Sequence, residues 1–302
     1  MSISLRAALT QSIGQLNMDA VTDYQIAKIM IALYQRKSFE GQNIDRIQRD
    51  VPDRQAYHSH LNGLIKNGVL KPVQSERSGL YAVLDRKNIS AQDVACIADP
   101  FGYIAYLSAM VHHGITDKLP NTLHICTLPS RHWREKAETL QQKELGYSTK
   151  ELKAMGLPPL RRITIPKYGR TNIYQHETVH HGGFITISNR PTRVASIGRT
   201  FLDMLRRPDL CGGMAHVINV FKKYAPQYQK LIILELDQHG SKIDKVRAGF
   251  ILNEVMGILD STTMEKWLTC AQRGGSQKLD PKGEYYHEFS DKWCLSINLP
   301  LE

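Results

Sequence analysis

Apolar residues recur at helical spacing near the start of the chain. Between residues 5 and 16, leucines and isoleucines are separated by three or four positions, which predicts one apolar stripe on a short helix. Thr22 and Gln25 have the spacing of a capping box and precede a second stripe, so we expect a helix at about 23–36. A further short helix is expected at 43–51, with an asparagine N-cap, ended by the following proline.

The most clearly bounded element is a helix at 54–67. Asp53 can cap its first turn, and Asn67-Gly68 supplies a left-handed C-terminal stop. Two strand-like runs follow at 69–73 and 80–84, joined by a polar turn. This order of helices and hairpin is typical of a winged helix-turn-helix, in which the last helix enters the DNA major groove and the hairpin tip contacts the backbone or minor groove.

The 54–67 helix has a polar face opposite its apolar residues. Side chains on that face can donate hydrogen bonds to phosphates or to base edges, which makes them candidate DNA contacts. These candidates are Arg54, Gln55, His58, Ser59, Asn62 and Lys66, and Arg77 in the hairpin turn is a candidate phosphate contact. Two other interpretations remain: a solvated helix face beside an ordinary hairpin, and a winged fold that contacts only proteins.

The rest of the chain alternates helix-like and strand-like patterns. A short linker at 86–92 separates them from the first part, so we expect an α+β protein with a winged helix-turn-helix at 1–88 and a larger mixed α/β domain at 89–302. Expected strands lie at 123–128, 161–165, 171–176, 184–188 and 293–298. Expected helices run from Asp99 to a break at His113, within 131–156, from Ser196 to Pro208, from Gly213 through Tyr224, and over 242–256.

Four segments of this second part resemble the AbiEi antitoxin family. They are "DPFGYIAYLSAMVHHG" from Asp99, "VASIGRTFLD" from Val194, "HGSKIDKVRAGFILNEV" from His239 and "KLDPKGEYYHEFSDKWCLSINLP" from Lys278. The resemblance implies a bacterial toxin–antitoxin or phage-defence operon, whose antitoxin represses its own promoter and counteracts a nucleotidyltransferase-like AbiEii toxin. It implies operator DNA and, functionally, that toxin as partners, with two copies engaging an inverted repeat.

Within the second of these segments, Arg199 and Asp203 are four residues apart on one expected helix. We expect them to form an ion pair whose role is mainly architectural. The alternative interpretation is that they form part of a functional surface.

Charge supports a polyanionic partner. The 302 residues carry 39 Lys+Arg against 29 Asp+Glu, and residues 1–88 alone carry 12 basic and 8 acidic side chains, so both parts are basic. Arg161, Arg162, Lys167 and Arg170 form a run without an acid, which suits operator phosphates or toxin-bound RNA, or equally a solvated basic face.

Several classes of protein are disfavoured. No apolar run approaches the ~20 residues that span a bilayer, and the start of the chain lacks the pattern of a secretory signal, so we expect a cytoplasmic protein without a membrane partner. The five cysteines are far apart and contain no C-x-x-C pair, which indicates reduced thiols.

Catalytic and metal chemistry has weak support. His176, His180 and His181 would suit a metal only on a helix, which Gly182-Gly183 disfavours. A metal-dependent nuclease that uses Asp117, Glu151 and Lys153 is the alternative function, although such spacing is common by chance. Nucleotide-binding loops and nucleophile motifs are absent from the sequence, so we expect no cofactor, no metal and no enzymatic activity.

Overall fold

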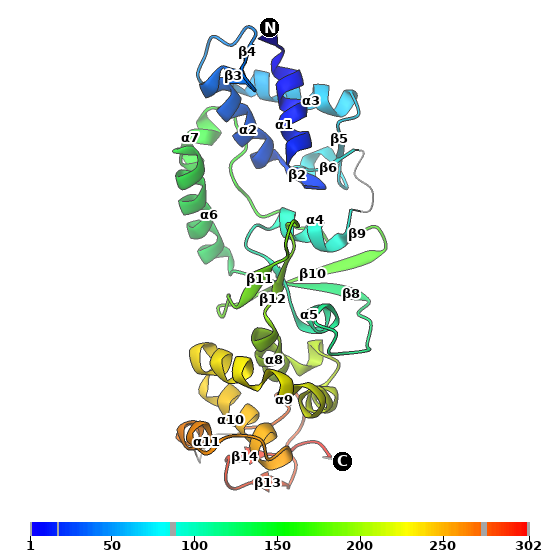
Figure 1. Cartoon of the computed structure of the whole chain (residues 1–302), viewed down its shortest axis with the longest axis vertical. Coiled ribbons are helices and arrows are strands. Elements are labelled where there is room, and N and C mark those ends of the chain that lie inside the picture. The colour runs from blue at the N-terminus through cyan, green and yellow to red at the C-terminus, as the bar shows by residue number, and fades with distance from the viewer. Residues whose placement is uncertain (1, 17, 85–88, 273–276, 301–302) are drawn as a thin grey trace. The chain divides into compact units, whose positions relative to one another are not determined.

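A computed structural model describes residues 2–16, 18–84, 89–272 and 277–300 of the chain (Figure 1). The fold is mixed α+β, as expected, and consists of two compact units. The first comprises Met1–Gly102, Thr127–Val179 and Thr186–Thr192, and the second comprises Tyr103–Cys126, His180–Ile185 and Arg193–Glu302. Of the linker expected at 86–92, residues 86–88 lie outside the described residues, and a helix already begins at Ala91.

Three helices and a three-stranded sheet form the start of the first unit. The helices are α1 (Leu5–Gln15), α2 (Asp23–Arg36) and α3 (Arg54–Lys66). The antiparallel sheet has the order β2-β6-β5, from β2 (Ala20–Thr22), β5 (Leu70–Pro72) and β6 (Leu80–Val83). Thr22 and Gln25 form the expected capping box, and the Asp53 carboxylate accepts from the Ala56 N–H at 2.8 Å. The predicted helices at 5–16, 23–36 and 54–67 and the hairpin strands are therefore confirmed.

The apolar stripes of these helices meet in one core. Leu9, Ile13, Ile26, Met30 and Leu64 are each completely buried there. Burial of a side chain of this kind contributes roughly 1.5–3 kcal/mol, so the stripes read from the sequence account for how the helices pack.

The helix expected at 43–51 is wrong. Residues Gln42–Ile44 form strand β4, which pairs with β3 (Ser38–Phe39) as an antiparallel hairpin and with β1 (Ser2–Ile3) in parallel. Gly41 turns the hairpin with φ +78°, a conformation that glycine adopts without strain. Ile44 is one of the apolar residues whose spacing suggested a helix. It is instead buried in β4, where it pairs with Ile3 of β1, about forty residues away in sequence.

The remainder of the first unit is helical with one long hairpin. Its elements are α4 (Ala91–Ala98), α6 (Ser130–Leu145), α7 (Thr149–Ala154), β9 (Lys167–Tyr168) and β10 (Thr171–Glu177). Helix α6 lies beside α2 (Figure 1), where the Glu144 carboxylate accepts from Tyr24 Oη and pairs with Lys28. The strand expected at 171–176 and the helices expected within 131–156 are confirmed.

The strand expected at 161–165 is wrong, and helix α4 had not been expected. Ile163 and Ile165 are buried, as the alternation indicated. However, the Ile163 N–H donates to the carbonyl of Ala98 at the end of α4 rather than to a neighbouring strand. Alternating burial alone does not make a strand when the backbone finds a helix end as its partner.

The second unit combines short strands with a helical end. The strands are β7 (Tyr103–Ile104), β8 (Thr122–Thr127), β11 (Phe184–Thr186), β12 (Arg193–Ala195), β13 (Phe289–Ser290) and β14 (Leu295–Ser296). The helices are α5 (Tyr106–His112), α8 (Ile197–Arg206), α9 (Met214–His239), α10 (Lys242–Phe250) and α11 (Ser261–Leu268), with a π-helical turn at Ile251–Val255. Strand β7 pairs antiparallel with β8 and parallel with β12.

Three expectations for this unit need correction. The helix expected from Asp99 begins only at Tyr106, because the backbone first forms strand β7. Helix α9 continues past Tyr224 to His239 with a proline inside it, and α11 was not expected. The last strand covers two residues rather than 293–298.

Helix α8 carries the expected ion pair. Arg199 Nε donates to Asp203 Oδ1 at 2.8 Å, and both side chains are only 3% exposed. Phe201, on the same helix, meets Phe221 of α9 edge to face at 4.8 Å. The pair is therefore part of the packed interior of the second unit, which agrees with an architectural role.

Candidate nucleic-acid interface

Helix α3 presents one continuous polar face to solvent. Tyr57, Leu61 and Leu64 point into the core. The six candidate DNA contacts, Arg54, Gln55, His58, Ser59, Asn62 and Lys66, are all exposed on the opposite side of the helix. The structure therefore brings the predicted contacts together on a single surface. A helix of 13 residues is long enough to lie in a major groove, whose width of ~12 Å admits an α-helix.

The N-terminal end of α3 is fixed by charge and hydrogen bonding. Arg49 Nη1 contacts Asp53 Oδ2 at 2.5 Å, while the other carboxylate oxygen caps the helix. The hydrogen bond from the Ala56 N–H lowers the pKa of Asp53, because it stabilises the charged carboxylate. Tyr57 Oη donates to the backbone carbonyl of Asp23 at 3.1 Å, which ties α3 to the start of α2.

The turn between β5 and β6 is held in shape from within and from outside. The Ser78 hydroxyl donates to the carbonyl of Val73 at 2.7 Å inside the turn. From outside, the Arg161 guanidinium donates to the carbonyl of Ser78 at 2.8 Å and lies 3.2 Å from Asp23 Oδ2. Burial raises the pKa of Asp23, and the Arg161 charge partly offsets that rise. Arg77 is left exposed on the turn.

A basic cavity of about 390 Å³ adjoins the first turn of α3. Arg54, His58 and Arg77 line it together with Lys153 and Arg161, which come from the α7 region of the same unit. Gly156, after α7, packs directly on α3: a Cβ at that position would lie 2.4 Å from Cβ of Arg54. Lys153 is thus a candidate contact that the helix pattern of residues 54–67 could not reveal, because it lies far away in sequence.

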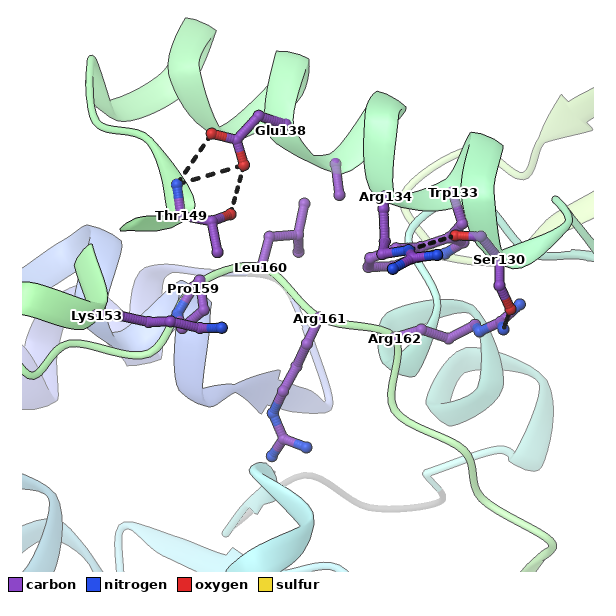
Figure 2. Close-up of a pocket in the computed structure, with 11 residues that line it drawn as sticks. Ser130, Trp133, Arg134, Glu138, Thr149, Lys153, Pro159, Leu160, Arg161 and Arg162 are labelled. Atoms are coloured by element: carbon purple, nitrogen blue, oxygen red, sulfur yellow. Dashed lines mark hydrogen bonds between the residues drawn. The ribbon is translucent and has the colours of Figure 1, made fainter. Parts of the chain in front are cut away.

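The predicted basic run at 161–170 is only partly one surface. Arg161 is engaged at the β5–β6 turn, whereas Arg162 donates to the Leu128 carbonyl and pairs with Glu177 at 2.8 Å. Figure 2 shows these two neighbouring arginines pointing apart. Lys167 and Arg170 are exposed on the β9–β10 hairpin. Gln74, in the β5–β6 turn, donates to the Lys167 carbonyl at 3.1 Å, so these cations lie next to that turn.

The residues considered for metal or nuclease chemistry do not assemble in the described parts of the chain. There, no group of three or more His, Cys, Asp or Glu side chains is placed to hold a metal ion. Glu151 serves as the capping-box partner of Ser148, and its pKa is lowered by the Ser148 N–H. Asp117 belongs to the second unit, whereas Glu151 belongs to the first. Among the described helices, none combines the length and the apolar composition needed to cross a membrane.

No protein-family model matches the chain, and no curated protein matches it. Among solved structures, the chain is similar to the RV2827C protein from Mycobacterium tuberculosis, with 11% sequence identity and a TM-score of 0.48. That alignment covers 96% of this chain and 90% of the other. A likeness of this level assigns no function.

Proposed function

We propose that the chain binds duplex DNA through α3 and the β5–β6 turn, as a winged helix. The observation that carries the proposal is the uninterrupted exposed face of α3, on which arginine, lysine, asparagine, glutamine, serine and histidine side chains gather. The order of the elements supports it, because β5 and β6 follow α3 directly and pair as an antiparallel hairpin, which is where a wing would contact the DNA backbone.

The contacts would divide into two kinds. Asn62 and Gln55 carry amide groups that can read adenine in the major groove, and Arg54 can read guanine. Lys66 and Arg77 are exposed cations that would pair with phosphates and so position the protein without reading sequence. Two copies on an inverted repeat would place their α3 helices one helical turn apart, ~34 Å, or a multiple of it.

We further propose, from the resemblance to the AbiEi family, that the DNA is the chain's own operator and that the chain is an antitoxin. In that role it acts in the cytoplasm and counteracts a nucleotidyltransferase-like toxin. Co-expression tests this directly: the chain should restore growth of cells that express such a toxin from a neighbouring gene, and toxicity that persists would refute the antitoxin role.

The DNA proposal is tested by titrating the full chain against DNA from upstream of its own gene and against a scrambled duplex. Binding should prefer the upstream DNA and fall steeply between ~50 and ~200 mM salt. The triple variant Arg54→Ala, Asn62→Ala, Lys66→Ala should lose that preference, while Lys143→Ala, an exposed cation on α6, should retain it. Unchanged affinity of the triple variant would leave the polar face of α3 as a protein-interaction surface.

A further inference from the structure

The first unit contains a second groove. It has a volume of about 590 Å³ and lies between α6, α7 and the segment 159–162 (Figure 2). Its apolar lining consists of Trp133, Ala137, Pro159 and Leu160. Its basic lining consists of Arg134, Lys153, Arg161 and Arg162.

Two of these four cations form no ion pair with the residues that the structure describes. Arg161 and Arg162 already pair with carboxylates, as described above. Arg134 uses Nε to donate to the Ser130 carbonyl at 3.1 Å, which leaves its terminal nitrogens for another partner. Within the described residues, the Lys153 ammonium forms no hydrogen bond or ion pair, and the side chain is exposed. Figure 2 shows Arg134 and Lys153 on opposite sides of Leu160, so both can reach a ligand that lies over it.

The one carboxylate in the lining, Glu138, is hydrogen-bonded to Thr149. Glu138 accepts hydrogen bonds from the Thr149 N–H at 3.0 Å and from the Thr149 hydroxyl. Glu138 therefore closes the α6–α7 corner, and its single negative charge is outnumbered by the four cations of the lining. The net electrostatic character of the groove is positive, which favours an anionic ligand.

The walls of the groove are held by buried hydrogen bonds. Trp133 is 4% exposed, and its indole N–H donates to Asp99 Oδ1 at 2.9 Å. The buried Gln141 side chain accepts from the Leu160 N–H at 2.9 Å and donates to the Tyr147 carbonyl at 3.1 Å. A groove whose shape is set by buried hydrogen bonds does not have to be ordered by its ligand, which reduces the entropy cost of binding.

We propose that this groove binds a nucleoside phosphate, either free or as the terminal residue of a single strand. A volume of about 590 Å³ lies in the range of small-molecule sites, roughly 300–1,000 Å³. The apolar lining suits the flat face of a base, and the cations on either side suit a phosphate. A duplex backbone would need the cations but not the apolar lining, and it is too wide to enter.

The groove is connected to the DNA-binding surface. Lys153 and Arg161 line both this groove and the cavity beside α3. An occupant that engages Lys153 would therefore weaken DNA binding, and this second part of the inference rests on the proposed function. The ligand site itself does not.

The test measures binding of AMP and UMP to the full chain by calorimetry, without DNA. We expect saturable binding of at least one nucleotide. The unphosphorylated nucleoside and inorganic phosphate should each bind at least about tenfold more weakly, because the first lacks the phosphate group and the second lacks the base. Arg134→Ala and Lys153→Ala should each weaken nucleotide binding by about tenfold or more. Lys150→Ala, an exposed cation on α7 outside the groove, should leave it unchanged.

A second readout protects against variants that fail to fold. Nucleotide should change tryptophan fluorescence in the wild type, and Trp133→Phe should remove that change, since the other two tryptophans belong to the second unit. If a 5′-phosphorylated tetranucleotide binds more tightly than AMP, the ligand of the groove is the end of a single strand. If AMP binds more tightly, the ligand is the free nucleotide. Absence of saturable binding by all of these probes, or nucleotide binding insensitive to Arg134→Ala and Lys153→Ala, overturns the site. Nucleotide binding without any operator binding refutes only the DNA proposal.

Discussion

Replacing Arg199 with methionine should destabilise the second unit strongly at neutral pH. Arg199 lies between two carboxylates: Asp203 Oδ1 is 2.8 Å from Nε, and Glu235 Oε1 is 3.9 Å from Nη1. The exposed fractions of the three side chains are 3%, 3% and 11%, so methionine would leave two acids buried without their cation. Removing one partner from such a buried pair costs about 3–5 kcal/mol in the free energy of unfolding.

The cost should depend on pH in a definite direction. Burial raises the pKa of Asp203 to about 6, and the Arg199 charge limits that rise, so the variant's Asp203 should have a still higher pKa. A raised folded-state pKa means that stability from this group is present when it is protonated and is lost as the pH rises through the folded pKa. The penalty of Arg199→Met should therefore be smaller at pH 5 than at pH 7.

Urea unfolding followed by tryptophan fluorescence measures this effect. In a Trp133→Phe background the signal comes from Trp267 and Trp293, both completely buried in the second unit. The control is Arg207→Met, whose partner Asp209 is 3.0 Å away with a side chain 24% exposed. Hydrogen bonding from Arg207 lowers the pKa of Asp209 to about 2, so Asp209 stays ionised and the cost of the control should change little between pH 5 and 7. That cost should be under about 1 kcal/mol, because the Arg207 side chain is 41% exposed and Lys282 Nζ still pairs with Asp209 at 2.8 Å. A loss below about 1 kcal/mol for Arg199→Met, or the same loss at both pH values, would refute the reasoning.

Three further predictions concern the proposed DNA surface. Asn62→Ala should cost about 1–3 kcal/mol in operator affinity and relax specificity, whereas Lys66→Ala should weaken all sequences alike and flatten the salt dependence; fluorescence anisotropy at several salt concentrations separates the two. Arg161→Ala should speed amide exchange in the β5–β6 hairpin and cost about 1 kcal/mol, a modest value because its side chain is 44% exposed; exchange rates equal to the wild type would contradict its bracing role. Gly156→Ala should destabilise more than Gly146→Ala, although both glycines have φ +74°, because only the first Cβ would collide with helix α3; equal melting temperatures would exclude that close packing.

Local sequence determined several of the helices and their ends. Asp53 and the Asn67-Gly68 pair bounded α3 to within a residue, and the capping box at Thr22 marked where α2 begins. Such signals operate within one helical turn, between residues three or four apart, so no knowledge of the rest of the chain is needed. For the same reason the polar face of α3 could be assembled from the sequence, because it needs only the helical period and the position of the apolar stripe.

Tertiary structure alone decided the elements and sites whose partners are distant in sequence. Ile44 is part of a strand because it pairs with Ile3. Residues 161–165 do not form a strand, because the Ile163 N–H donates to the Ala98 carbonyl at the end of α4. The cavity beside α3 needs Lys153 next to Arg54, and the second groove needs α6, α7 and the segment 159–162 in one place. Backbone pairing and side-chain convergence over ~100 residues depend on the global packing of the chain, which the period of a local pattern does not encode.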